Sequence, residues 1–195
     1  MTAFQEHLRR EARRILEGFP GAVKGEIYVV SFRVWRREQD PRYPYVAIGF
    51  NTESEVRRVL GGESSDPGTA RWEYAYWLLE GFEALGHLED DPVGSRLYVE
   101  EVRARGLWYD DDPSGDTQDE AEQEASDELL YRHFADACVE LARHLHAEGS
   151  VAAALGHEVP IVLFDMDCPG WEVEATEAAN PPYLVADFLE HHSGE

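Results

Sequence analysis

The chain has 195 residues, of which 43% are hydrophobic and 11% aromatic, and this composition predicts one globular domain over residues 1–195 rather than a disordered chain. Its formal net charge of -23 argues against direct binding to nucleic acid or to an anionic membrane surface, and favours a basic protein partner. We predict a cytoplasmic protein without a membrane span, because the N-terminus is charged and no long apolar segment is present. The two cysteines, Cys138 and Cys168, lack metal-ligand spacing and fit this prediction.

The N-terminal third has one helical pattern and two strand patterns. Thr2 and Gln5 have capping-box spacing, and apolar residues recur at helical intervals from Phe4 to Phe19. Residues 26–35 and 43–50 are rich in β-branched and aromatic residues, and the charged turn between them predicts a β-hairpin. In the first strand we expect one face to carry Tyr28, Val30, Phe32 and Val34.

The middle of the chain combines short helices with polar loops. Thr52 to Glu55 form a second capping box, which predicts a helix through Leu60, and residues 61–68 are expected to be a loop. Residues 71–86 are rich in aromatic residues, and their helical spacing predicts a helix that covers the core. Residues 93–105 predict a further helix.

The C-terminal half contains the clearest amphipathic helix. It is preceded by an acidic segment, which is expected to be an excursion at residues 109–125, and it runs from Ser126 to near Gly149. A short apolar strand at 159–164 and a helix at 183–192 follow. The order of elements lacks a regular βαβ alternation, so we predict an α+β fold with a small, mainly antiparallel sheet covered by helices.

Asp165 and Asp167 follow the apolar strand with the spacing of the first motif of haloacid-dehalogenase-type phosphatases. That family resemblance would imply a nucleophilic aspartate and magnesium, but too little chain follows, without lysine or arginine, to supply the remaining motifs. We therefore interpret the two aspartates as a turn at the end of a strand. A metal-dependent hydrolase that uses them remains an alternative.

The other polar patterns do not predict a catalytic centre, a bound metal or a cofactor. His144 and His146 point to different faces of a helix, and His191 and His192 lie in a tail that we expect to fray. The acidic segment lacks the ligand spacing of an EF-hand. It can instead attract a basic partner beside two aromatic anchors, and the residues expected to bind that partner are Trp108, Tyr109, Asp110, Asp111, Asp112 and Asp116.

Several short motifs together resemble a bacterial family labelled domain of unknown function 4303. The matching positions are spread over most of the chain: Asn51, Thr52 and Glu53; Arg71, Trp72 and Trp77; Phe164 and Asp165; Asn180 and Pro181. The resemblance implies a fold more than an activity. If these positions matter, Arg71 and Asp165 are expected to form a partly buried ion pair, and Trp72 to form the wall of a groove.

The leading functional hypothesis is a binding protein without catalytic activity that sequesters a basic protein. By analogy of size and acidity it is similar to the immunity proteins that accompany bacterial toxins. Two alternatives remain open, the hydrolase described above and a regulatory domain that binds a small molecule in an aromatic pocket. The residues expected to line that pocket are Trp72, Tyr74, Tyr76 and Trp77. The sequence leaves the oligomeric state open.

Overall fold

The computed structural model describes residues 1–62, 66–78, 82–110, 120–166, 168 and 170–193. Within these residues a four-stranded sheet has the order β3-β2-β1-β4. It is formed by β1 (Ile27–Arg36), β2 (Pro44–Thr52), β3 (Glu83–Gly86) and β4 (Ile161–Phe164). β2 pairs antiparallel with both β1 and β3, whereas β4 lies parallel to β1. The predicted α+β class with a mainly antiparallel sheet is therefore confirmed.

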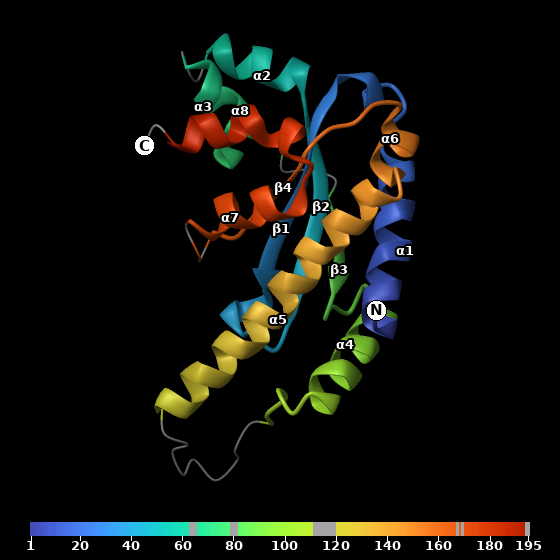
Figure 1. Cartoon of the computed structure of the whole chain (residues 1–195), viewed down its shortest axis with the longest axis vertical. Coiled ribbons are helices and arrows are strands. Elements are labelled where there is room, and N and C mark those ends of the chain that lie inside the picture. The colour runs from blue at the N-terminus through green and yellow to red at the C-terminus, as the bar shows by residue number, and fades with distance from the viewer. Residues whose placement is uncertain (63–65, 79–81, 111–119, 167, 169, 194–195) are drawn as a thin grey trace.

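Helices cover both faces of the sheet (Figure 1). One face carries α1 (Ala3–Gly18), α4 (Pro92–Ala104), the long diagonal α5 (Glu120–Ala147) and the short α6 (Ser150–Leu155). The opposite face carries α2 (Glu53–Leu60), α3 (Pro67–Trp72) and α8 (Pro182–Ser193), and α7 (Trp171–Ala179) lies beside β4. Three single 3₁₀ turns complete the described elements, at Lys24–Glu26, Arg37–Gln39 and Tyr74–Tyr76.

Side chains that alternate along the strands separate two hydrophobic cores. In β4, Ile161 and Leu163 enter the larger core under α1 and α5, whereas Val162 and Phe164 enter the smaller core under α2, α3 and α8. The smaller core also contains Trp72, Trp77 and Phe188, all of them buried. Because β4 is buried on both faces, it is a continuous apolar run without polar alternation.

Most predicted elements are present, and one prediction about a strand face is wrong. The capping box at Thr2, the hairpin, the helices at 53–60 and 92–104 and the strand at 161–164 agree with the structure. Tyr28, however, does not share a face with Val30. An irregularity in register between Ile27 and Val29 changes the alternation, so Tyr28 lies in the smaller core.

The predicted helix over 71–86 is wrong. α3 ends at Trp72, the backbone of Glu73 is extended, and residues 83–86 form the edge strand β3. The structure also contains two short helices that the sequence pattern did not predict, α6 and α7, and α3 begins at Pro67, inside the segment 61–68 that was expected to be a loop. Of the acidic excursion expected at 109–125, residues 120–125 instead form the first turns of α5, and residues 111–119 lie outside the described residues.

Side chains of α7 and of its C-cap residue, Asn180, form hydrogen bonds with the backbone at the outer edge of β4. The Asn180 amide accepts a hydrogen bond from Ile161 N at 2.7 Å and donates one to Ile161 O at 2.7 Å. The Thr176 hydroxyl accepts from Leu163 N at 3.0 Å and donates to Leu163 O at 3.3 Å. His146 Nε2 lies 2.8 Å from Asn180 Oδ1, which is already an acceptor, so this imidazole nitrogen carries the proton. The edge of the sheet is thereby closed by side chains.

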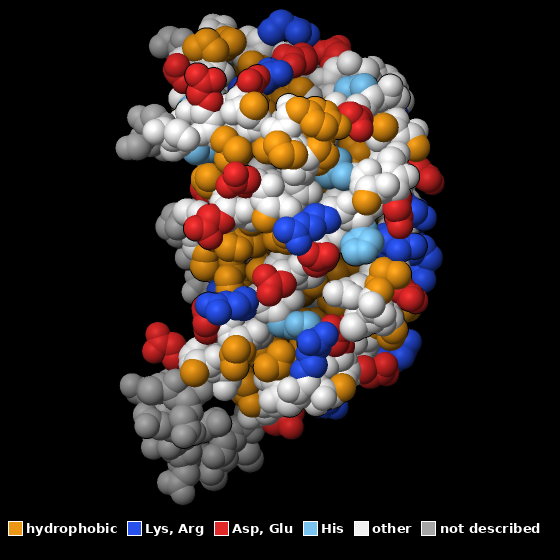
Figure 2. Space-filling view, in the orientation of Figure 1, with side chains coloured by type: hydrophobic (Ala, Val, Ile, Leu, Met, Phe, Trp, Pro, Cys, Tyr) orange, Lys and Arg blue, Asp and Glu red, His pale blue; other side chains and the backbone are white. Residues whose placement is uncertain are grey.

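Charge is unevenly distributed over the surface. Basic side chains gather along the edge over α1, where Arg9, Arg10, Arg13 and Arg14 lie, while acidic and basic groups are mixed across the rest of the visible face (Figure 2). The arginines of α1 are paired locally, for example Arg9 with Glu148 at 3.2 Å and Arg14 with Glu83 at 2.7 Å. Among the described helices, none is both long and apolar enough to cross a membrane.

Candidate functional site

Four of the positions that suggested a family resemblance share one hydrogen-bond network: Asn51, Glu53, Arg71 and Trp77. The Arg71 guanidinium forms two hydrogen bonds with the Glu53 carboxylate, at 3.1 and 2.5 Å, and lies 4.2 Å from the ring centroid of Tyr28. The Arg71 backbone carbonyl accepts hydrogen bonds from the Tyr28 hydroxyl and, at 2.8 Å, from Trp77 Nε1. Asn51 donates to the same Tyr28 hydroxyl at 3.0 Å. This network fixes α3 against the sheet.

Two of the remaining motif positions have local structural roles. Thr52 is the N-cap of α2 and accepts a hydrogen bond from Glu55 N at 3.3 Å. Trp72 is 8% exposed and packs edge-on against the rings of Tyr28 and Phe188, with both centroid distances 5.7 Å. Trp72 is thus part of the smaller core.

The expected ion pair between Arg71 and Asp165 is wrong. Asp165 is 2% exposed and pairs with Arg36, whose Nη2 lies 3.2 Å from Oδ2, and Arg71 pairs with Glu53 instead. Asp165 O also accepts a hydrogen bond from Cys168 N at 3.3 Å, as in a turn after a strand. Asp167 lies outside the described residues. A buried carboxylate compensated by a guanidinium needs no metal ion to balance its charge.

A pocket of about 120 Å³ opens between α3, α7 and α8, on the smaller core. We call it the aromatic pocket, and its lining residues are Trp72, Glu73, Tyr74, Trp77, Val162, Phe164, Glu172, Phe188 and His192. The ring of Tyr74 stacks on that of Phe164 with centroids 5.1 Å apart, and Trp77 meets Phe164 edge-on at 5.9 Å. Tyr76 packs against the same core but is not among the lining residues. Rigid ring packing therefore defines the walls.

The carboxylates of Glu73 and Glu172 and the imidazole of His192 line this pocket, and His191 lies next to Glu73. The pKa of the half-buried Glu172 is raised above its ordinary value of 4.5. Burial is the largest cause, and the negative charges of Glu73 and Asp165 add to it. Within the described part of the chain, Glu172 has no cationic partner. Glu73 lies 3.4 Å from His191 Nε2, and the rings of His191 and His192 have centroids 5.0 Å apart. The pocket thus combines aromatic faces with excess negative charge.

The aromatic residues expected to anchor a partner at the acidic segment already have internal contacts. Trp108 Nε1 donates to Asp110 at 2.9 Å, and Arg103 lies 5.4 Å from the Trp108 ring centroid. The Tyr109 hydroxyl donates to Asp127, and Arg42 lies 5.1 Å from the Tyr109 ring centroid. Both rings are half-buried against the larger core. The other proposed partner-binding residues, Asp111, Asp112 and Asp116, lie outside the described residues.

A buried histidine–aspartate pair elsewhere in the molecule joins two helices. His7 Nε2 lies 2.8 Å from Asp91 Oδ1, and Arg10 donates to His7 Nδ1 at 2.9 Å, so His7 is a neutral donor to the carboxylate. Asp91 also accepts hydrogen bonds from Gly86 N and Gly94 N. The Asp91 carboxylate thus caps α4 and also connects it to α1 through His7 and to β3 through Gly86, which is a structural role.

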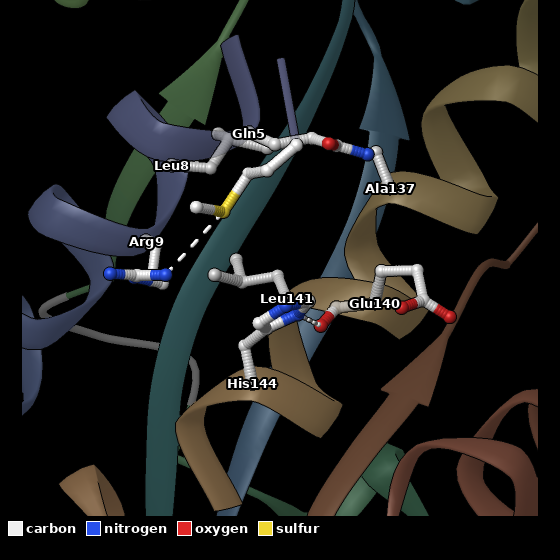
Figure 3. A pocket seen from close by; sticks show the side chains of 8 residues that line it. Gln5, Leu8, Arg9, Ala137, Glu140, Leu141 and His144 are labelled. Carbon is white, nitrogen blue, oxygen red and sulfur yellow. Dashed lines mark hydrogen bonds between the residues drawn. The ribbon is translucent and has the colours of Figure 1, made fainter. Parts of the chain in front are cut away.

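A small cavity between α1 and α5 is a packing gap. Its volume is about 10 Å³, and it lies among Leu8, Leu141 and His144, with Arg9 Nη1 donating to the sulfur of Met1 at 3.4 Å (Figure 3). Such a volume holds at most one water molecule. The aromatic pocket is therefore the better candidate for a ligand.

Sequence reasoning identified part of the aromatic pocket. Trp72, Tyr74 and Trp77 are near one another in the chain, so their clustering was visible as an aromatic-rich segment. Glu172 and His192 come from α7 and α8, about a hundred residues later. The local sequence around them resembles an ordinary amphipathic helix surface, and it carries no signal that they face a distant aromatic cluster.

No protein-family model, curated protein or solved structure matches this chain. The resemblance to domain of unknown function 4303 therefore stays a prediction.

Proposed function

We propose that this protein binds a basic protein partner and accepts one cationic side chain of that partner in the aromatic pocket. Aromatic rings carry negative electrostatic potential on their faces, and a cation held against them gains about 0.5–2 kcal/mol. The pocket offers the rings of Trp72, Tyr74 and Trp77 for such contacts. Its carboxylates, Glu73 and Glu172, add charge of the sign that attracts a cation.

The observation that carries this proposal is that Glu172 lies half-buried in the pocket wall near a second carboxylate and without a cationic partner among the described residues. A half-buried carboxylate with a raised pKa and another carboxylate as its neighbour is electrostatically unfavourable when ionised. A cation placed between Glu172 and Glu73 would relieve both the desolvation and the repulsion. Structural carboxylates elsewhere in the chain, such as Glu53 and Asp165, already have a guanidinium partner.

The size of the pocket favours a single side-chain head group. About 120 Å³ corresponds to roughly four water molecules at about 30 Å³ each. Pockets for complete drug-sized ligands are larger, at about 300–1,000 Å³. The guanidinium of arginine and the ammonium end of lysine have the number of heavy atoms that fits.

The net charge of -23 would accelerate the encounter with a basic protein at low salt. Sequestration of that partner in the cytoplasm, as by an immunity protein, is the finer form of the proposal. In that form, the acidic segment with Asp110 guides the partner electrostatically, and the aromatic pocket anchors it. Both contributions are expected to weaken when salt is added, the guiding charges most strongly.

The proposal is tested by calorimetric titration with a lysine-rich peptide, an arginine-rich peptide and a control peptide with glutamine at the basic positions, all in a metal chelator. We expect one or both basic peptides to bind, with a change in the fluorescence of Trp72 and Trp77. Glu172→Gln is expected to reduce the affinity severalfold.

The matched control is Glu177→Gln, which removes the same charge from an exposed position on the same helix. If Glu177→Gln weakens binding as much as Glu172→Gln does, the peptides recognise only overall charge and the pocket proposal is wrong. Binding of the glutamine peptide with equal affinity would contradict it as well.

A further inference from the structure

We propose that Glu73, His191 and His192 form a binding site for a transition-metal ion, with Zn²⁺ as the best-fitting ion. This inference does not rest on the proposed function. The carboxylate of Glu73 and one nitrogen from each imidazole all lie within 4.8 Å of one another. All three side chains are half-buried, so they are accessible to an ion from solvent. His191 Nε2 is 3.4 Å from Glu73 Oε1.

The donor set selects the kind of metal. Two imidazole nitrogens and one carboxylate oxygen are ligands typical of zinc, which accepts them in tetrahedral geometry and leaves a fourth position for water or another ligand. Magnesium and calcium prefer oxygen ligands, so imidazoles discriminate against them. Small rotations of the three side chains would bring their donor atoms to the spacing of a tetrahedral site.

The fold holds the two histidines in place. Sequence reasoning predicted a frayed tail here, but α8 extends to Ser193 and its last turn packs against α3. The ring of His192 packs edge-on against Phe188, with centroids 4.4 Å apart, and Phe188 is 1% exposed. Glu73 directly follows Trp72, a second core residue. The smaller core therefore restrains both proposed ligands, His192 through its contact with Phe188 and Glu73 through its neighbour in the chain, Trp72.

Gly68 leaves the space that His191 needs. A Cβ atom at Gly68 would lie only 2.7 Å from His191 Nδ1 and 3.3 Å from Asp66 Oδ2. The edge of the imidazole opposite to Glu73 therefore lies near the Asp66 carboxylate, whose pKa is lowered mainly by hydrogen bonds from Thr69 and in part by His191. A carboxylate beside a ligating histidine is the usual outer arrangement at zinc sites, where it orients the ring.

The experiment uses the full-length chain without a histidine tag, titrated with Zn²⁺ alone by calorimetry and followed by thermal unfolding. We expect one saturable site and a rise in Tm with zinc. His191→Ala and His192→Ala are each expected to reduce zinc affinity at least about tenfold. Gly68→Ala keeps every ligand but displaces the His191 ring, and is expected to reduce affinity by about tenfold.

The control variant is His144→Ala, which removes a half-buried histidine from α5, outside the proposed site. It is expected to bind zinc like the unmodified protein. The proposal is overturned if no saturable zinc binding occurs, or if His144→Ala weakens binding as much as the other variants. It is also overturned if Mg²⁺ binds as tightly as Zn²⁺ and the histidine variants bind normally, because the ion then sits on acidic surface groups. The peptide titrations contain chelator, so the two proposals fail independently.

Discussion

Arg71 and Glu53 form a bidentate ion pair, with Nη1 to Oε2 at 3.1 Å and Nη2 to Oε1 at 2.5 Å. The planar guanidinium also covers the ring of Tyr28 at 4.2 Å. A lysine ammonium would provide one charge but neither the paired geometry nor the flat stacking surface. The arrangement therefore depends on arginine specifically.

We expect Arg71→Lys to reduce the free energy of unfolding by about 1 kcal/mol, because it loses the second hydrogen bond and the contact with Tyr28. Urea denaturation measures this change. Arg57→Lys is the control, since Arg57 is largely exposed and its pair with Glu26 is a surface pair of little energetic value. Equal stability of the two variants would contradict the structural importance of the bidentate pair.

Asn180→Ala is expected to destabilise the protein by about 2–3 kcal/mol. The substitution leaves the backbone N–H and C=O of Ile161 buried without their amide partner, and unsatisfied buried groups are costly. Denaturant unfolding gives the magnitude, and light scattering reports whether the uncovered β4 edge promotes association. A stability equal to that of the exposed-site control Glu177→Ala would show that this edge contributes little.

Tyr98→Phe is expected to leave stability unchanged or raise it by up to about 1 kcal/mol. Tyr98 is fully buried, and among the described residues its hydroxyl has no hydrogen-bond partner, so burial raises its pKa. The matched control is Tyr28→Phe, which should lose about 1–2 kcal/mol, because the Tyr28 hydroxyl bonds both Asn51 and Arg71 O. Thermal unfolding compares the two variants. Destabilisation of Tyr98→Phe to the same extent would contradict this assignment.

Stability should fall as the solution is acidified from pH 7 to about pH 5. Burial lowers the pKa of His87, His133 and His146 below their ordinary value of 6.5. A histidine with a lowered folded pKa stabilises the fold above its unfolded pKa, and this contribution is lost as pH falls through the folded pKa. Urea denaturation across this range measures the loss. His146→Gln should make it smaller, whereas a His146→Gln protein with an unchanged pH slope would exclude a contribution from this site.

The sequence predicted the elements that are determined by residues close together in the chain. The Thr2–Gln5 capping box and the apolar run of β4 depend on neighbouring residues, and both agree with the structure. Thr52 also caps α2 as predicted, although the Glu55 side chain bonds Arg58 and does not complete a capping box. The conformation of the segment after Trp72 is instead determined by tertiary packing, because its aromatic residues cover the sheet. The strand β3 was missed because it contains no β-branched residue. The register irregularity near Tyr28 likewise arises from strand pairing. Of the candidate sites, only the contiguous aromatic part was predictable.

The hydrogen bonds between β4 and the side chains of Thr176 and Asn180 limit how the proposed partner could bind. An extended peptide commonly binds by adding a strand to an open sheet edge, and most of its hydrogen bonds are then made by its backbone and not by its side chains. At β4 those backbone groups already bond the side chains of Thr176 in α7 and of its C-cap Asn180, so an added strand would have to displace this helix. For the proposed basic partner, binding beside α7 would therefore depend on its side chains, and their charge would be the feature that distinguishes one partner from another.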